Sequence, residues 1–189
     1  MRSPLARAIA ALAAVLERLD VRWYLFGAQA ALLYGAARLT ADIDVTVDLG
    51  DRELVVLVRA LDKAGFRLRV RDVGGFVAAT RVVPLLHRPS GMPIDIVLAG
   101  PGLEDLFFTR RRRRVVEGVR IPVASPEDII VMKILAGRGK DDDDAVAILA
   151  ARPKLNADLV RATLATLERA LDQTDLRPRF EDLLLRARS

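Results

Sequence analysis

The segment Leu39-Thr40-Ala41-Asp42-Ile43-Asp44-Val45 carries two aspartates separated by one apolar residue. The pattern of residues 42–47 is typical of a β-strand, in which successive side chains point to opposite faces. Asp42 and Asp44 would therefore share one face, while the apolar residues between and after them point into the core. Two neighbouring carboxylates repel each other, and a divalent cation removes this repulsion. The pair is therefore a candidate metal site.

A third aspartate and a glycine turn accompany this pair. Asp95 lies between two isoleucines in the apolar stretch 93–98, which is also expected to be a strand. If that strand neighbours residues 42–47, three carboxylates converge on one patch, enough for two divalent ions about 4 Å apart. Upstream, Gly27 and Ala28 lie where a strand gives way to a helix. Glycine permits close backbone approach and the free N–H groups of a helix attract phosphate, so a triphosphate is expected at this turn.

The composition limits the possible chemistry. The chain has 189 residues, no cysteine and a single histidine, His87, which excludes disulfides, thiol nucleophiles and multi-histidine metal sites. Carboxylate ligands favour Mg²⁺ or Mn²⁺. The net charge of +5 suits a polyanionic partner. No uncharged apolar stretch reaches the roughly 18 to 20 residues that cross a bilayer, so we expect a cytoplasmic protein without membrane contact.

The hydrophobic pattern predicts an α/β (α+β) protein in which strands dominate residues 21–123 and helices follow from residue 125 onward. We therefore expect one domain over residues 1–124 and a helical segment, packed on it, over residues 125–189. Strands are expected at residues 21–26, 42–47, 66–70, 76–81, 83–87 and 93–98, and between 110 and 123 around Gly118. Helices are expected at residues 4–20, 28–37, 51–64, shortly after 102, at 125–137 and over most of the remainder.

Three separated motifs occur in order along the chain: Gly27-Ala28, Asp42-Ile43-Asp44 and Ile94-Asp95-Ile96. This order resembles the polymerase beta superfamily of nucleotidyltransferases. Within that superfamily, residues 38–44 together with the stretch KILAGRGKDDDD at 133–144 are similar to the AbiEii/AbiGii toxin type. The likeness covers roughly residues 5–150, and it is specific because the motifs are separate and in order.

The resemblance implies a palm domain with a mixed sheet, followed by a C-terminal helical segment, with Mg²⁺ or Mn²⁺ as cofactor and an NTP as donor. By position, Asp42, Asp44 and Asp95 would be catalytic metal ligands, and Lys133 a further catalytic residue. The nucleotide-binding residues that it implies are Gly27, Ala28, Arg38, Thr40, Lys133, Arg138, Lys140, Asp141 and Asp144.

Several of these residues also have purely structural interpretations. The family turn commonly has Ser or Gly after its glycine, whereas Ala28 keeps the backbone donor and lacks a hydroxyl. The acids at 141–144 are expected at a helix N-terminus, where the macrodipole favours them. Lys133 could be a solvated lysine opposite an apolar helix face. Arg38 and Thr40 could support the strand or reach a phosphate.

Five consecutive arginines occupy positions 110–114. They could pair with several phosphates of a nucleic acid, which would make binding strongly salt-dependent. They could equally be a solvated loop or an edge strand that its charge protects from aggregation. No aromatic residue is interleaved among them, so a base-stacking platform is not indicated.

We therefore expect a metal-dependent nucleotidyltransferase that moves an NMP from an NTP to an acceptor. The acceptor could be a tRNA or other RNA 3′ end, a protein hydroxyl or a small molecule such as an antibiotic, and the basic charge favours RNA. The resemblance also allows a toxin with an antitoxin partner. The alternative is a catalytically weak regulatory module that keeps the fold and binds a nucleotide or a partner.

Overall fold

The computed structural model describes residues 3–37, 40, 42–100 and 102–188. The chain forms two compact units, and each unit combines two stretches of sequence. The sheet unit comprises Met1–Gly27 and Thr40–Ala124, and the helical unit comprises Ala28–Leu39 and Ser125–Ser189. The segment 28–39, which the sequence places in the first domain, thus belongs with the C-terminal helices.

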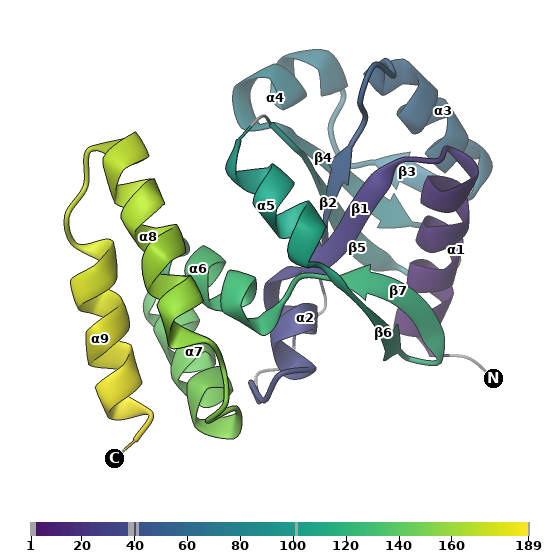
Figure 1. The fold of residues 1–189 in the computed structure, drawn as a ribbon. Coiled ribbons are helices and arrows are strands. Elements are labelled where there is room, and N and C mark those ends of the chain that lie inside the picture. The colour runs from purple at the N-terminus through teal and green to yellow at the C-terminus, as the bar shows by residue number, and fades with distance from the viewer. Residues whose placement is uncertain (1–2, 38–39, 41, 101, 189) are drawn as a thin grey trace. The chain divides into compact units, whose positions relative to one another are not determined.

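One mixed sheet of seven strands forms the sheet unit, in the order β3-β4-β5-β2-β1-β7-β6 (Figure 1). β1 pairs antiparallel with β2, β2 pairs parallel with β5, and β1 pairs parallel with β7. The predicted mixed α/β architecture is confirmed. The strands are β1 (Arg22–Phe26), β2 (Ile43–Asp48), β3 (Phe66–Leu68), β4 (Val82–His87), β5 (Met92–Leu98), β6 (Arg112–Val116) and β7 (Val119–Val123).

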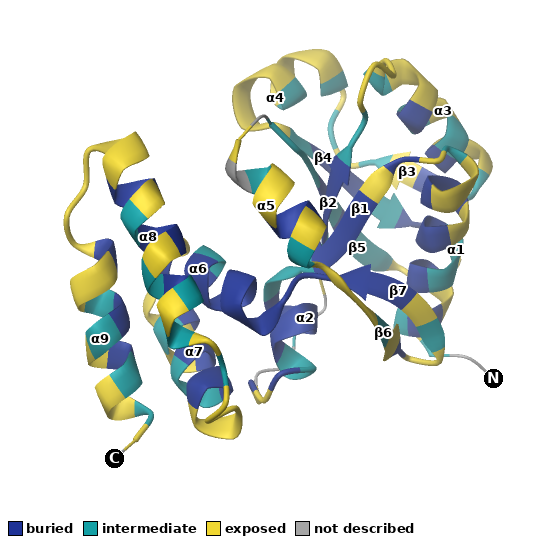
Figure 2. Ribbon diagram, in the orientation of Figure 1, coloured by how far each residue is buried: buried dark blue, intermediate teal, exposed yellow. Residues whose placement is uncertain are grey.

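Helices cover both faces of this sheet. Figure 1 shows α1 and α3 on one side and α5 on the other. Alternate residues of the central strands, such as Ile43, Val45 and Ile96, are fully buried, as the dark strands of Figure 2 show. Each such side chain contributes about 1.5–3 kcal/mol by leaving water. The helices of this unit are α1 (Pro4–Arg18), α3 (Leu54–Lys63), α4 (Val73–Thr80) and α5 (Leu103–Arg110).

The predicted strand at residues 76–81 is wrong, because this segment lies in helix α4 and its cap. Asp72 precedes the helix, and its side chain accepts a hydrogen bond from the Gly75 N–H. The helix ends at Arg81, whose φ of 59° is left-handed. The β-branched and aromatic residues of this segment are typical of a strand. The side chain of Asp72, however, caps the first turn of a helix by accepting a hydrogen bond from a backbone N–H, and this favours the helix.

The helical unit contains most of α2 (Gly27–Leu32) and the helices α6 to α9. The C-terminal helices hold the segment that follows α2: Arg152 donates hydrogen bonds to the carbonyls of Leu33 and Tyr34. Gly35, at φ 121°, lies so close to Ala151 that a side chain would not fit. The helices are α6 (Pro126–Ala136), α7 (Gly139–Ala151), α8 (Ala157–Leu171) and α9 (Leu176–Arg186). Within the described ranges, every helix is too short or too polar to span a bilayer.

Candidate active site

The aspartates Asp44 and Asp95 lie directly opposite each other on neighbouring strands. β2 and β5 pair in parallel, with Asp44 in register with Asp95. The strand that carries Asp95 is thus a neighbour of the strand that carries Asp44, which the sequence alone could not establish. Paired residues point to the same face, and neighbouring strands lie about 4.8 Å apart. Both side chains are half-buried, so the two carboxylates share one accessible patch.

Gly27 lies against the Asp44 carboxylate. Its φ is +68°, and a Cβ built on it would approach Asp44 Oδ2 to 2.1 Å. The preceding residue, Phe26, is paired with Asp44 across β1 and β2. Only glycine is compatible with this conformation and this contact. The turn therefore brings bare backbone next to the carboxylate.

Asp42 is placed differently from the sequence prediction. β2 begins at Ile43, so Asp42 is an exposed residue just before the strand, and strand alternation does not orient it. Its N–H donates to Thr40 Oγ1 at 3.3 Å. Across the described ranges, no three His, Asp or Glu side chains are grouped closely enough to hold a metal ion. The structure therefore brings together two of the three predicted carboxylates.

Arg69, which the sequence did not single out, forms an ion pair with Asp95. It lies just beyond β3, and its N–H donates to the Pro84 carbonyl of β4. The strand order β3-β4-β5 carries this arginine to the patch. No local pattern around Arg69 reveals the strand order, so the sequence held no signal for it.

A second polar cluster lies inside the helical unit. Lys133 Nζ donates to Asp141 Oδ1 at 2.8 Å and to Asp144 Oδ2 at 2.6 Å. All three residues are buried, with Lys133 at 6% and Asp141 at 0% exposure. Burial pushes the pKa of Asp141 upward, but hydrogen bonds from Arg138 and Lys133 outweigh it and hold the pKa below its ordinary value. The interpretation of Lys133 as a solvated lysine is therefore wrong.

The remaining predicted residues are dispersed. Ala28 is buried in α2, and Lys140 is exposed near the start of α7. Asp142, which the sequence treated as one of several structural acids, accepts two hydrogen bonds from Arg179 of α9. Arg38 lies outside the described residues. His87 is buried against Phe66 and its Nδ1 lies 2.7 Å from Ser90 Oγ, which agrees with a structural role.

A family described as "Nucleotidyltransferase of unknown function (DUF6036)" matches residues 3–184. The chain belongs to this family. The predicted resemblance to nucleotidyltransferases and the predicted enzyme class are thereby confirmed. No curated protein matches the sequence.

Solved structures of nucleotidyltransferases share this fold. The ANT(2″)-Ia complex with adenylyl-2″-tobramycin is 17% identical, with a TM-score of 0.59 over 87% of this chain and 97% of that one. An antigenic nucleotidyltransferase-like protein from Paracoccidioides brasiliensis is 20% identical, with a TM-score of 0.56 over 94% and 91%. The lincosamide antibiotic adenylyltransferase LnuA, bound to lincomycin, is 16% identical, with a TM-score of 0.53 over 78% and 98%.

Proposed function

We propose that this nucleotidyltransferase transfers a nucleoside monophosphate from an NTP to an acceptor hydroxyl at the patch of Asp44 and Asp95. The pairing of these carboxylates on one face of the sheet, beside the bare turn at Gly27, carries the proposal. Two adjacent acids favour a cation, and a turn without a side chain lets a phosphate approach the backbone. Gly27 and Ala28 would donate backbone N–H groups to the triphosphate.

The residues present fit a divalent cation such as Mg²⁺ or Mn²⁺. Carboxylate oxygens are the ligands that these hard ions prefer. Asp44 and Asp95 would hold the ion, with Asp42 as a further ligand from the chain just before β2. A bound ion supplies charge neutralisation for the triphosphate and a lower pKa for the acceptor hydroxyl. Arg69, which pairs with Asp95, is the group that such an ion would displace from that carboxylate.

We also assign the cations of the helical unit to nucleotide binding. Lys133 has three N–H donors and uses two of them on Asp141 and Asp144, so one donor is available for a phosphate oxygen. The side chain of Arg138 is 61% exposed, and Lys140 is exposed as well. Asp141 and Asp144 would fix the position of Lys133. In this proposal Arg38 and Thr40 contribute from the segment before β2.

RNA, including tRNA, is the acceptor that we favour. The net charge of +5 and the exposed arginines of β6 support an acceptor that carries many phosphates. A toxin role would follow if the modified RNA were needed for growth. In that case, expression of the protein should arrest growth, the Asp44→Asn variant should not, and a partner antitoxin should relieve the arrest.

The transfer itself is tested with each α-labelled NTP, Mg²⁺ or Mn²⁺, and total RNA. We expect label to enter RNA, and we expect Asp44→Asn or a chelator to lower the rate by about 100-fold or more. Asp62→Asn is the matched control, because it alters an exposed acid of the same unit that pairs with Arg88. If Asp44→Asn labels RNA at the wild-type rate, the assignment of the site is wrong.

A small-molecule acceptor is the second candidate, because two neighbours of the same fold carry an adenylylated aminoglycoside or a bound lincosamide. The same labelled NTPs with an aminoglycoside and a lincosamide in place of RNA test this candidate. Label in the small molecule and none in RNA would replace our favoured acceptor. Nucleotide binding with no labelled product in any reaction, including one with protein acceptors, would instead favour the catalytically weak module.

A further inference from the structure

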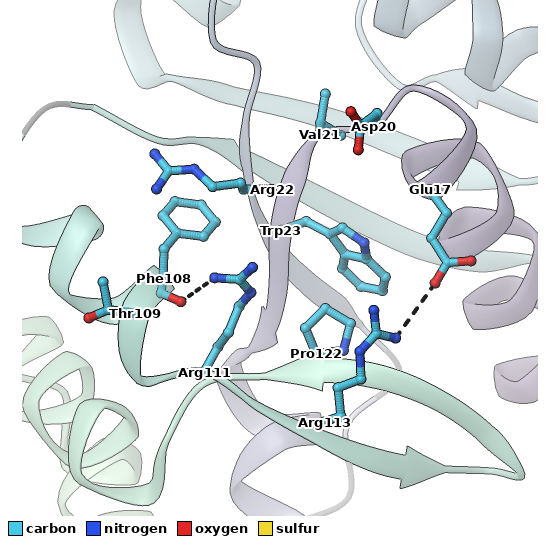
Figure 3. Close-up of a pocket in the computed structure, with 10 residues that line it drawn as sticks. All are labelled: Glu17, Asp20, Val21, Arg22, Trp23, Phe108, Thr109, Arg111, Arg113 and Pro122. Atoms are coloured by element: carbon cyan, nitrogen blue, oxygen red, sulfur yellow. Dashed lines mark hydrogen bonds and ion pairs between the residues drawn. The ribbon is translucent and has the colours of Figure 1, made fainter.

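A pocket of about 590 Å³ opens in the sheet unit beside the first half of β1 (Figure 3). Its origin lies in the sheet, because β1 and β7 are in register at only one position, Leu25 with Val123. Before that point β1 is not paired with β7, and the space between them remains open. The indole of Trp23 and the ring of Pro122 form part of the lining. The volume is that of a typical ligand site.

The pocket contains three guanidinium groups from three elements. Arg22 of β1 and Arg111 at the end of α5 lie 4.8 and 5.8 Å from the centre of the Phe108 ring. Arg113 of β6 lines the part of the pocket near Pro122, away from Phe108 (Figure 3). Three cations therefore face a single cavity.

These three arginines differ in how their charge is compensated. Arg22 forms ion pairs with Asp48 and Asp105, whose hydrogen bonds raise its pKa. Arg113 has a loose contact of 3.9 Å with Glu17. Among the described residues, the guanidinium of Arg111 donates only to the Phe108 carbonyl and has no acidic partner. Burial, Arg22 and Arg113 together lower the pKa of Arg111, so its surroundings oppose its charge.

Known structural roles explain only part of this arrangement. Charges on β6 protect an edge strand, and β6 is the edge of this sheet. Arg111 precedes β6, however, and Figure 3 shows its side chain between Phe108 and Pro122. Its bond to Phe108 is a favourable helix C-terminal contact, but it uses only one of the five guanidinium donors. The other donors suit a planar anion such as phosphate.

We propose that this pocket, with Arg111 at its centre, binds backbone phosphates of the acceptor RNA strand; the inference rests on the proposed function. Arg112 and Arg114, which alternate with Arg113 along β6, add positive charge outside the pocket. The wall that carries Glu17 and Asp20 repels phosphate but accepts hydrogen bonds from ribose hydroxyls or base amino groups.

The position of the pocket suits an acceptor strand. β1 begins at Arg22, which lines the pocket, and ends at Phe26, next to Gly27. The pocket and the carboxylate patch are therefore about 13 Å apart along the strand. Arg22, paired with Asp48, and Phe26, paired with Asp44, point to the same face of the sheet. Tyr24, which lies between them on this face, is buried under Phe108 of α5, so a strand held at the pocket would pass over α5 and bring its reactive end to Asp44.

Binding of a fluorescent single-stranded RNA by anisotropy, without NTP and with EDTA, tests the pocket apart from transfer. Arg111→Gln/Arg113→Gln should weaken binding by at least about tenfold at low salt and reduce the slope of log K against log [KCl] by about 1.4. The matched control is Arg59→Gln/Arg67→Gln, which removes two exposed arginines around another pocket of the sheet unit. Equal loss in both variants, or no loss in the first, would overturn the proposal.

A measurement on the unaltered protein guards against a folding defect in the variant. Phenylglyoxal modification followed by mass spectrometry should show that RNA protects Arg111 and Arg113 but leaves Arg59 and Arg67 reactive. If ATP or inorganic phosphate at equal phosphate concentration protects these arginines, the pocket binds a small ligand, and the proposal that it binds an RNA strand is overturned. Because none of these experiments needs turnover, RNA binding can fail while transfer to another acceptor persists, and the two proposals are separable.

Discussion

Gly27 is the residue on which the geometry of the carboxylate patch depends most directly. Its backbone is left-handed, and its missing side chain leaves space that the Asp44 carboxylate uses. An alanine costs about 1–2 kcal/mol in that conformation and would also collide with Asp44 Oδ2. The glycine therefore sets the position of the acid as well as the shape of the turn.

Gly27→Ala should lower the transfer rate by about 100-fold, because a displacement of about 1 Å at a reacting group costs that much. Gly50→Ala is the control, since Gly50 has a similar φ of +55° but nothing within 4 Å of an added Cβ. Transfer rate and thermal melting are measured for both variants. Equal losses of activity would mean that the contact with Asp44 is unimportant.

At the scale of the element, Lys133, Asp141 and Asp144 join α6 to α7. The sequence placed these residues in one motif, and the structure buries them as an ion cluster. A buried ammonium between two carboxylates is costly to desolvate, so the cluster stabilises the unit only while it is complete. Removing the lysine would leave two buried acids without their shared cation.

Lys133→Met should destabilise the protein by about 3–5 kcal/mol, the usual cost of removing one partner from a buried ion pair. Lys140→Met, an exposed lysine of the same helix pair, should change stability by less than about 0.5 kcal/mol. Urea unfolding followed by circular dichroism measures both variants. Similar midpoints for the two would show that the cluster contributes little.

The sequence predicts those elements and site residues whose positions depend on neighbouring residues, and it does not predict those that depend on how distant strands are arranged. Alternation within residues 42–47 and 93–98 was enough to place Asp44 and Asp95 on strands, because strand side chains have a period of two. Helix α4 was missed because the cap by Asp72 outweighs the strand-like composition of the segment. Arg69 could not be found, because its meeting with Asp95 depends on the order of three strands.

For the molecule as a whole, His87 connects stability to pH, because it is the chain's one histidine. Burial, and then the charge of Arg7, lower its pKa in the folded state. The folded protein thus resists protonation, so stability is complete above about pH 6.5, the unfolded value, and falls as the pH drops below it. The loss cannot exceed about 1.4 kcal/mol for each pH unit.

Thermal melting should therefore occur at lower temperature at pH 5.5 than at pH 7.5, and His87→Gln should remove most of this difference. The variant will also lose stability at both pH values, because the ring packs on Phe66 and bonds to Ser90. The informative quantity is the difference between the two pH values. An unchanged difference in His87→Gln would assign the pH dependence to other groups.

The pairing of Leu25 with Val123 has a consequence for how the protein is made. β1 leaves the ribosome early, but β7 follows roughly a hundred residues later, which is about 5–20 seconds of synthesis. During that interval β1 can pair with β2 on one side, while its other edge has no partner within the chain made so far. Such an edge can pair with other extended chains, so we expect the nascent protein to be prone to aggregation until β7 has been made.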